Sequence, residues 1–126
     1  MKKLLIAFLL LIFSPIYANG WLQFEKTFDG SMTHFIDTRS IEGAATKRVW
    51  TYTNFTYPAN GGILSYKNLW ELDCEKKVVR YLHHSEFRQK NLAGTPVTYW
   101  DGVSPWTHIS PDSVSSTLKK IVCRKQ

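Results

Sequence analysis

The sequence predicts an α+β domain, with a single antiparallel β-sheet of about six strands and one C-terminal helix packed on it. Three observations support this fold class. Between residues 21 and 100, apolar and polar residues alternate in short segments rich in β-branched and aromatic side chains. Turn-forming Gly, Pro and Asp residues separate these segments. After residue 110, the apolar residues recur instead at the spacing of an amphipathic helix.

Residues 1–18 are excluded from the domain because they have the pattern of a bacterial-type secretory signal peptide. Lys2 and Lys3 precede an unbroken apolar run from Leu4 to Phe13, and small residues follow near a cleavage site. The run is shorter than the about 20 residues of a membrane-spanning helix, so a retained anchor is the less favoured alternative. No cysteine marks a lipid-attachment site. We therefore predict an exported protein, periplasmic or at the cell surface, with one domain at residues 19–126.

The first two strands are predicted at Trp21–Phe28 and Met32–Asp37. Asp29-Gly30 joins them, and this dipeptide favours a hairpin turn because glycine adopts a positive φ without strain. Alternation places three apolar side chains of the first strand on one face: Leu22, Phe24 and Phe28. Beyond the second strand, Ile41 is expected to pack into the core, and residues 42–46 are predicted to form a loop.

A third strand is predicted at Lys47–Asn54, with residues 55–57 as a candidate extension, followed by a loop at Pro58–Gly62. The segment Ser65–Leu82 is then predicted to form the central hairpin, because polar Glu75–Lys77 separates two alternating arms. Four residues share one face of the first arm: Asn68, Trp70, Leu72 and Cys74. A last strand at Thr95–Trp100 is expected at a sheet edge, because it contains a proline.

The C-terminal helix is predicted to start with Ser110 as its N-cap and Pro111 in its first turn. Its apolar residues recur at helical spacing: Val114, Leu118, Ile121 and Val122. Lysine and arginine residues near its C-terminus complement the helix dipole. This segment therefore supplies the one element that is expected to cover a face of the sheet.

Cys74 and Cys123 are the only cysteines in the chain. In an oxidising compartment, an even pair of cysteines is most simply a disulfide. The closed loop of about 50 residues would stabilise the domain by about 4 kcal/mol in the chain-entropy model. Cys123 lies opposite Val114 on a regular helix, so the helix is expected to end or unwind near Val122 if this bond forms.

The charge of the chain is mildly basic. The net charge of +6 falls to +4 without Lys2 and Lys3. A nucleic-acid-binding domain usually carries more charge, clustered on one face, so no nucleic-acid partner is expected. The charge is compatible with weak attraction to acidic polymers such as sulfated sugars, although solubility alone is the favoured explanation.

The sequence contains no G-x-S-x-G, H-E-x-x-H or phosphate-loop motif. His83 and His84 are adjacent, but neighbouring strand residues point to opposite faces, so the two are not expected to share a metal ion. Asp37 and Asp73 end predicted strands, where aspartate usually stabilises turns. We therefore predict no catalytic residue, no cofactor and no metal site, and we do not expect an enzyme.

Five tryptophans and six tyrosines are the most distinctive part of the composition. Trp50 and Trp70 lie on predicted strands and are expected in the core. Trp100 and Trp106 lie near loops and form the candidate binding surface, because exposed aromatic residues beside cations suit protein or glycan recognition. The alternative is that these residues also fill the single core.

Taken together, these segments resemble the surface-adhesin protein E family. The motifs are weak singly and more specific in their shared order, which covers nearly all of the mature chain. They are Asp29-Gly30, Phe35-Ile36-Asp37, Ser40-Ile41, Arg48-Val49-Trp50, Ser65-Tyr66-Lys67, Asp73-Cys74, Arg80, Gly94-Thr95-Pro96-Val97, Trp106, Ile109-Ser110-Pro111-Asp112-Ser113, Leu118 and Val122-Cys123.

The resemblance implies an antiparallel sheet with a C-terminal helix on one face and a Cys74–Cys123 bond. It also implies an exported, non-catalytic, adhesin-like protein that binds extracellular-matrix or other surface macromolecules. The alternative function is a periplasmic protein that binds an envelope component or assists another envelope protein. The matched positions are scaffold residues, so no binding residue is carried over. Open sheet edges and a bare sheet face make a homodimer one expected assembly.

Overall fold

The computed structural model describes residues 20–124, and the predicted signal peptide lies outside the described residues. The elements in chain order are β1 (Trp21–Lys26), β2 (Met32–Asp37), η1 (Thr38–Ser40), β3 (Glu42–Gly43), β4 (Thr46–Ala59), η2 (Asn60–Gly62), β5 (Ile63–Asp73), β6 (Val78–Phe87), η3 (Lys90–Leu92), β7 (Thr98–Asp101), β8 (Thr107–His108) and α1 (Val114–Val122). The η segments are short 3-10 turns. All strands belong to one antiparallel sheet with the order β1-β2-β4-β5-β6-β7, while β3 pairs with β4 and β8 pairs with β6.

The sheet has eight strands rather than the six or so that the sequence predicted. The two additional strands, β3 and β8, contain two residues each. Two residues are too few to produce an alternating pattern, which is why residues 42–46 were expected to be only a loop. Within residues 20–124, the antiparallel sheet, the single helix and the disulfide are confirmed.

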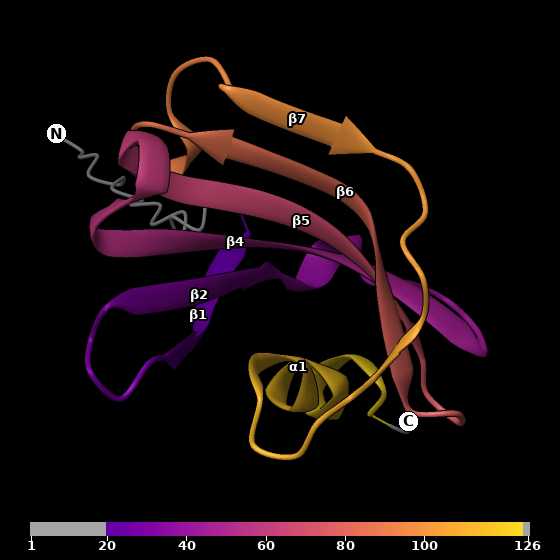
Figure 1. Ribbon diagram of the computed structural model, residues 1–126. Coiled ribbons are helices and arrows are strands. Elements are labelled where there is room, and N and C mark those ends of the chain that lie inside the picture. Colours follow the sequence, from indigo (N-terminus) through magenta and orange to yellow (C-terminus); the bar gives the residue numbers. More distant parts are fainter. Residues whose placement is uncertain (1–19, 125–126) are drawn as a thin grey trace, which may run out of the picture.

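Figure 1 shows that the sheet is strongly curved and that α1 lies on its concave side. We call the side that carries α1 the inner face and the opposite side the outer face. Seven buried residues form the core between α1 and the inner face: Ile36, Val49, Trp70, Leu72, Val79, Leu118 and Val122. Ile41 packs against this core as predicted, together with Phe24 and Ile121. Burying these side chains provides the main stabilisation of the contact between helix and sheet.

The central hairpin is confirmed by the pairing of β5 with β6. Leu72 lies opposite Val79 and Trp70 lies opposite Tyr81, so the apolar side chains share the inner face. The reversal occurs at residues 74–77, where the Asp73 carboxylate accepts hydrogen bonds from the backbone N–H groups of the next turn. Asp37 similarly accepts a hydrogen bond from the N–H of Arg39 and caps η1. Both aspartates therefore stabilise turns, as the sequence predicted.

The Cys74–Cys123 bond is present, with the two Cα atoms 5.7 Å apart. Helix α1 ends at Val122, and Cys123 is its C-cap residue, whose N–H donates to the carbonyl of Lys119. Both the bond and the helix end therefore agree with the sequence-based prediction. The disulfide links the end of the helix to the turn that joins β5 and β6.

The predicted start of the helix was wrong by three residues. Ser113, rather than Ser110, is the N-cap, and its hydroxyl accepts a hydrogen bond from the N–H of Ser116 at 3.1 Å. Asp112 has a φ of +58°, which interrupts a right-handed helix before Ser113. The segment that contains Pro111 is consequently a turn, and the hydroxyl of Ser113 also donates to the carbonyl of Ser110.

The predicted face of the first strand also needs correction. The register of β1 against β2 shifts at Phe24, which is the extra residue of a bulge and packs against the core. Leu22 is exposed, and Phe28 lies beyond the end of β1 and is fully exposed. The three residues therefore do not form one buried row, because the bulge and the early strand end interrupt the alternation.

Candidate functional site

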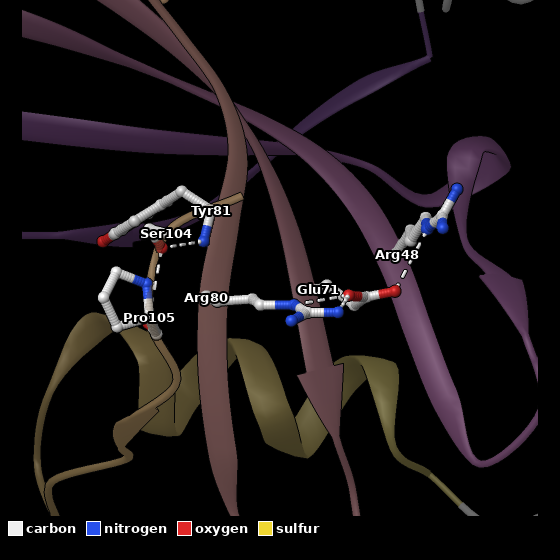
Figure 2. Close-up of polar contacts among 6 residues, drawn as sticks. All are labelled: Arg48, Glu71, Arg80, Tyr81, Ser104 and Pro105. Atoms are coloured by element: carbon white, nitrogen blue, oxygen red, sulfur yellow. Dashed lines mark hydrogen bonds and ion pairs between the residues drawn. The ribbon is translucent and has the colours of Figure 1, made fainter. Parts of the chain in front are cut away.

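The outer face carries a cluster of charged and aromatic side chains around Glu71. Glu71 is only 7% exposed, and its carboxylate lies between two arginines. Its Oε2 accepts from Nε of Arg48 at 3.2 Å, and its Oε1 is 2.8 Å from Nε and 2.7 Å from a terminal nitrogen of Arg80 (Figure 2). Charge-assisted hydrogen bonds to both oxygens hold the two guanidinium groups in fixed positions.

Trp106 extends this cluster. Its ring centroid lies 4.0 Å from the guanidinium carbon of Arg80, which is a favourable cation–π distance. The residue is 38% exposed, so the indole remains accessible at the surface. Two guanidinium groups against one carboxylate leave one net positive charge. We call Arg48, Glu71, Arg80 and Trp106 the arginine–tryptophan cluster.

The segment before Trp106 is held against β6 by paired hydrogen bonds. The N–H of Tyr81 donates to the hydroxyl of Ser104 at 2.8 Å (Figure 2). The N–H of Ser104 donates to the carbonyl of Tyr81 at 3.0 Å. Strand β8 follows and pairs with the start of β6. The chain on both sides of Trp106 is therefore attached to β6, which positions the indole beside Arg80.

A second cation–aromatic pair lies on the outer face, where Nζ of Lys67 is 4.8 Å from the ring centroid of Trp50. Trp50 was expected in the core, and this prediction was wrong. Val49 lies opposite Trp70 in the β4–β5 register and occupies the core, so the alternation directs Trp50 to the outer face, where it is half-buried. Trp70 is in the core, and its indole N–H donates to the hydroxyl of Thr51 at 2.7 Å.

His83 lies under Trp50 in a hydrogen-bonded chain that resembles a catalytic triad. Its Nδ1 is 2.7 Å from a carboxylate oxygen of Asp101, and its Nε2 is 3.0 Å from the hydroxyl of Ser85. The rings of Trp50 and Tyr99 each lie 5.3 Å from the imidazole, and Ser85 is only 2% exposed. A substrate carbonyl therefore has no approach to this hydroxyl, and the chain instead ties edge strand β7 to β6.

Hydrogen bonding also determines the ionisation of Asp101 on edge strand β7. The hydroxyl of Tyr99 donates to Asp101, and this bond, together with the bond from His83, lowers the pKa of the Asp101 carboxyl. The same contact with Asp101 raises the pKa of Tyr99. Asp101 therefore stays ionised and accepts hydrogen bonds from both neighbours, which fixes the edge strand.

His84 points to the inner face, opposite to His83, as the alternation predicted. Its Nδ1 is 2.6 Å from the amide oxygen of Asn68, and its Nε2 is 3.0 Å from a carboxylate oxygen of Glu86. Within residues 20–124, no group of three His, Cys, Asp or Glu side chains is arranged to hold a metal ion.

The structure places the two predicted binding residues on opposite sides of the sheet. Trp106 lies on the outer face, whereas Trp100 lies opposite His84 in the β6–β7 pairing and lines a hollow on the inner face. Trp100 is 41% exposed. Both tryptophans are thus accessible, but they belong to two different surfaces.

The sequence model of the family described as surface-adhesin protein E matches residues 21–124. The chain belongs to the surface-adhesin protein E family. Among solved structures, the chain is similar to protein E of Haemophilus influenzae, in its crystal form II. The two are 14% identical in sequence, with a TM-score of 0.61, and the match covers 93% of this chain and 96% of the other. No curated protein matches the chain.

The family assignment confirms the resemblance seen in the sequence, and the solved structure supports the fold. Family membership agrees with an exported or surface-associated adhesin. In the part of the chain that the structure describes, no helix is long and apolar enough to cross a membrane.

Sequence reasoning gave no role to the contacts of Glu71 with Arg48 and Arg80. One signal was present, because Glu71 and Arg80 face each other across the central hairpin. Opposite charges at facing positions favour such a pair. The contact with Arg48 depends on the register of β4 against β5, which the sequence alone does not specify.

Proposed function

We propose that this chain is an exported, non-catalytic, adhesin-like protein that binds extracellular-matrix or other surface macromolecules through its outer face. The observation that carries the proposal is the arginine–tryptophan cluster, in which one buried carboxylate holds two arginines and an accessible indole lies against Arg80. Membership of the surface-adhesin protein E family supports the class of function.

The cluster has the chemistry of a protein–protein hot spot. Tryptophan and arginine are the residue types most enriched at such positions, because they offer large contact areas and directional hydrogen bonds. Glu71 already restrains both arginines, so a partner has less side-chain entropy to remove on binding. The net positive charge favours acidic segments or sulfated glycans, which matrix glycoproteins carry.

A non-catalytic role is supported by the burial of the triad-like arrangement of Asp101, His83 and Ser85. Ser85 lies beneath the His83–Trp50 contact and cannot receive a substrate without opening the edge of the sheet. The hydrogen bond between His83 and Asp101 joins β6 to β7, so these residues have a structural role in the sheet.

Binding is tested with the mature protein, residues 19–126 with its disulfide intact, on immobilised laminin and fibronectin. We expect saturable binding that weakens as salt concentration rises, because part of the attraction is electrostatic. Trp106→Ala is expected to weaken the affinity tenfold or more, as for a typical hot-spot tryptophan. Tyr57→Ala is the matched control, because Tyr57 is an exposed aromatic residue outside the cluster. Full binding by the Trp106 variant, or no binding by the wild type, would refute the proposal.

Cellular location is tested by treating intact cells with a protease that cannot cross the outer membrane. A surface adhesin is degraded while a periplasmic control survives. Survival together with the control would place the protein in the periplasm. Its partners would then be components of the cell envelope, and the adhesin function would be wrong.

A further inference from the structure

A hollow on the inner face lies over β5, β6 and β7, and no residue of α1 lines it. It measures about 310 Å³ and is lined by Tyr66, Asn68, Tyr81, His84, Trp100 and Ser104. This volume is at the lower end of the range of about 300–1,000 Å³ for small-molecule sites. The lining combines aromatic rings with an amide, an imidazole and a hydroxyl.

A bulge brings two of the lining residues together. The β5–β6 register skips Leu82, so that Tyr81 lies opposite Trp70 and His84 lies opposite Asn68. Residues 81 and 84 would point to opposite faces of a regular strand, but the extra residue at position 82 directs both side chains to the inner face. The hollow therefore depends on a specific irregularity of β6.

The Trp100 ring lines one side of the hollow and packs against the chain at Gly102. A Cβ atom at Gly102 would lie 3.0 Å from the indole ring, so the ring packs directly against the glycine backbone. The N–H of Gly102 is itself bonded to the carbonyl of Leu82. The indole is thus supported on one side by the backbone of a segment anchored to β6, and it remains partly accessible.

Asn68 provides an unused polar group. The residue is only 6% exposed, and its amide oxygen is engaged with His84 at 2.6 Å. Its amide nitrogen has no hydrogen-bond partner among residues 20–124. This nitrogen keeps contact with solvent, so it can donate a hydrogen bond to a ligand that replaces water in the hollow.

We propose that this hollow binds a neutral saccharide of one or two pyranose rings. A pyranose has an apolar face of C–H groups that stacks on an aromatic ring, and Trp100 and Tyr81 provide accessible rings. Its hydroxyl groups accept from the amide nitrogen of Asn68 and exchange hydrogen bonds with the other polar groups of the lining. No lysine or arginine lines the hollow, so a neutral sugar fits better than a sulfated or carboxylated one.

The test uses the disulfide-bonded mature protein and three neutral disaccharides, cellobiose, maltose and N,N′-diacetylchitobiose. Saturation-transfer NMR and calorimetry report binding without relying on the fluorescence of five tryptophans. We expect at least one disaccharide to bind saturably, with little dependence on salt. Trp100→Ala is expected to weaken this binding at least tenfold, whereas Trp100→Phe, which keeps an aromatic ring, is expected to retain most of it.

Trp106→Ala is the matched control, because Trp106 is similarly exposed but lies on the outer face. It is expected to bind the sugar as the wild type does. The proposal is wrong if none of the three disaccharides binds, or if Trp100→Ala binds the sugar as the wild type does. The proposed outer-face function is measured on different residues, so either proposal can fail while the other stands.

Discussion

The inner and outer faces of the sheet use the same strands in different ways. On β5, Trp70 and Leu72 point inward and pack beneath α1, whereas Glu71, between them, points outward and holds two arginines. The inner contacts are apolar, buried and closed by a disulfide, while the outer contacts are polar and end at an accessible tryptophan. This difference indicates that α1 stabilises the fold through the inner face, while the outer face keeps an accessible region around the arginine–tryptophan cluster.

The largest expected effect is on the inner face. Leu118→Ala removes a fully buried side chain at the centre of the contact between helix and sheet. We expect it to lower the free energy of unfolding by about 3–5 kcal/mol, measured by urea denaturation. The folded fraction of the variant should still bind matrix glycoproteins with unchanged affinity. A loss below about 1 kcal/mol would contradict the assignment of Leu118 to the core.

Removing the disulfide is expected to have the next largest effect. Replacing Cys74 and Cys123 together with serine releases the end of α1 from the β5–β6 turn. We expect the free energy of unfolding to fall by about 2–4 kcal/mol. Mass spectrometry of the unreduced wild type is the control, and two free thiols would show that the bond does not form.

A smaller effect is expected from Glu71→Gln on the outer face. The substitution preserves size but removes the charge that holds Arg48 and Arg80 together. Since both arginines are partly exposed, solvent screens the interaction, and we expect a loss of only about 1–2 kcal/mol in stability. Binding to laminin should weaken, because Arg80 and Trp106 lose their fixed positions. If the variant loses stability but binds laminin normally, the arginine–tryptophan cluster has no role in binding.

The smallest expected effect is a pH dependence from His34 on the inner face. Burial lowers the pKa of His34 below its ordinary value of 6.5, while its Nδ1 is 2.7 Å from the hydroxyl of Thr53 and its Nε2 has no partner among the described residues. The unfolded chain therefore binds this proton more readily, and stability is lost as the pH falls from about 6.5 through the folded-state pKa.

His34→Gln is the variant that isolates this contribution to the pH dependence. One proton accounts for a slope of at most about 1.4 kcal/mol per pH unit. We expect the variant to show a shallower fall in stability between pH 7 and pH 5 in urea denaturation series. Identical slopes in variant and wild type would contradict the desolvation of His34.

Much of the fold was predictable because its strongest signals are local or covalent. The polar turn at Glu75–Lys77, the helical spacing around Leu118 and the two cysteines each appear directly in the sequence. The bulges at Phe24 and Leu82 were not predictable, because an extra residue in a strand leaves the apparent alternation intact while it reverses the faces beyond it.

The candidate sites were predicted less completely. Exposure of Trp100 and Trp106 was anticipated as one alternative, but their separation onto two faces depends on how β7 and β8 pair with β6. The position of Trp50 depends on which residue of β4 lies opposite Trp70. These features are set by contacts between distant segments, and neither residue type nor spacing encodes them directly.

The most direct test of the division between faces follows the indole N–H signals of the five tryptophans by NMR. Cross-saturation from unlabelled laminin reports which indoles lie at the interface. We predict that Trp106 and then Trp50 lose intensity, while Trp70, in the core, is unaffected. Loss of intensity at Trp100 with none at Trp106 would contradict the account, because the macromolecule would then bind the inner face.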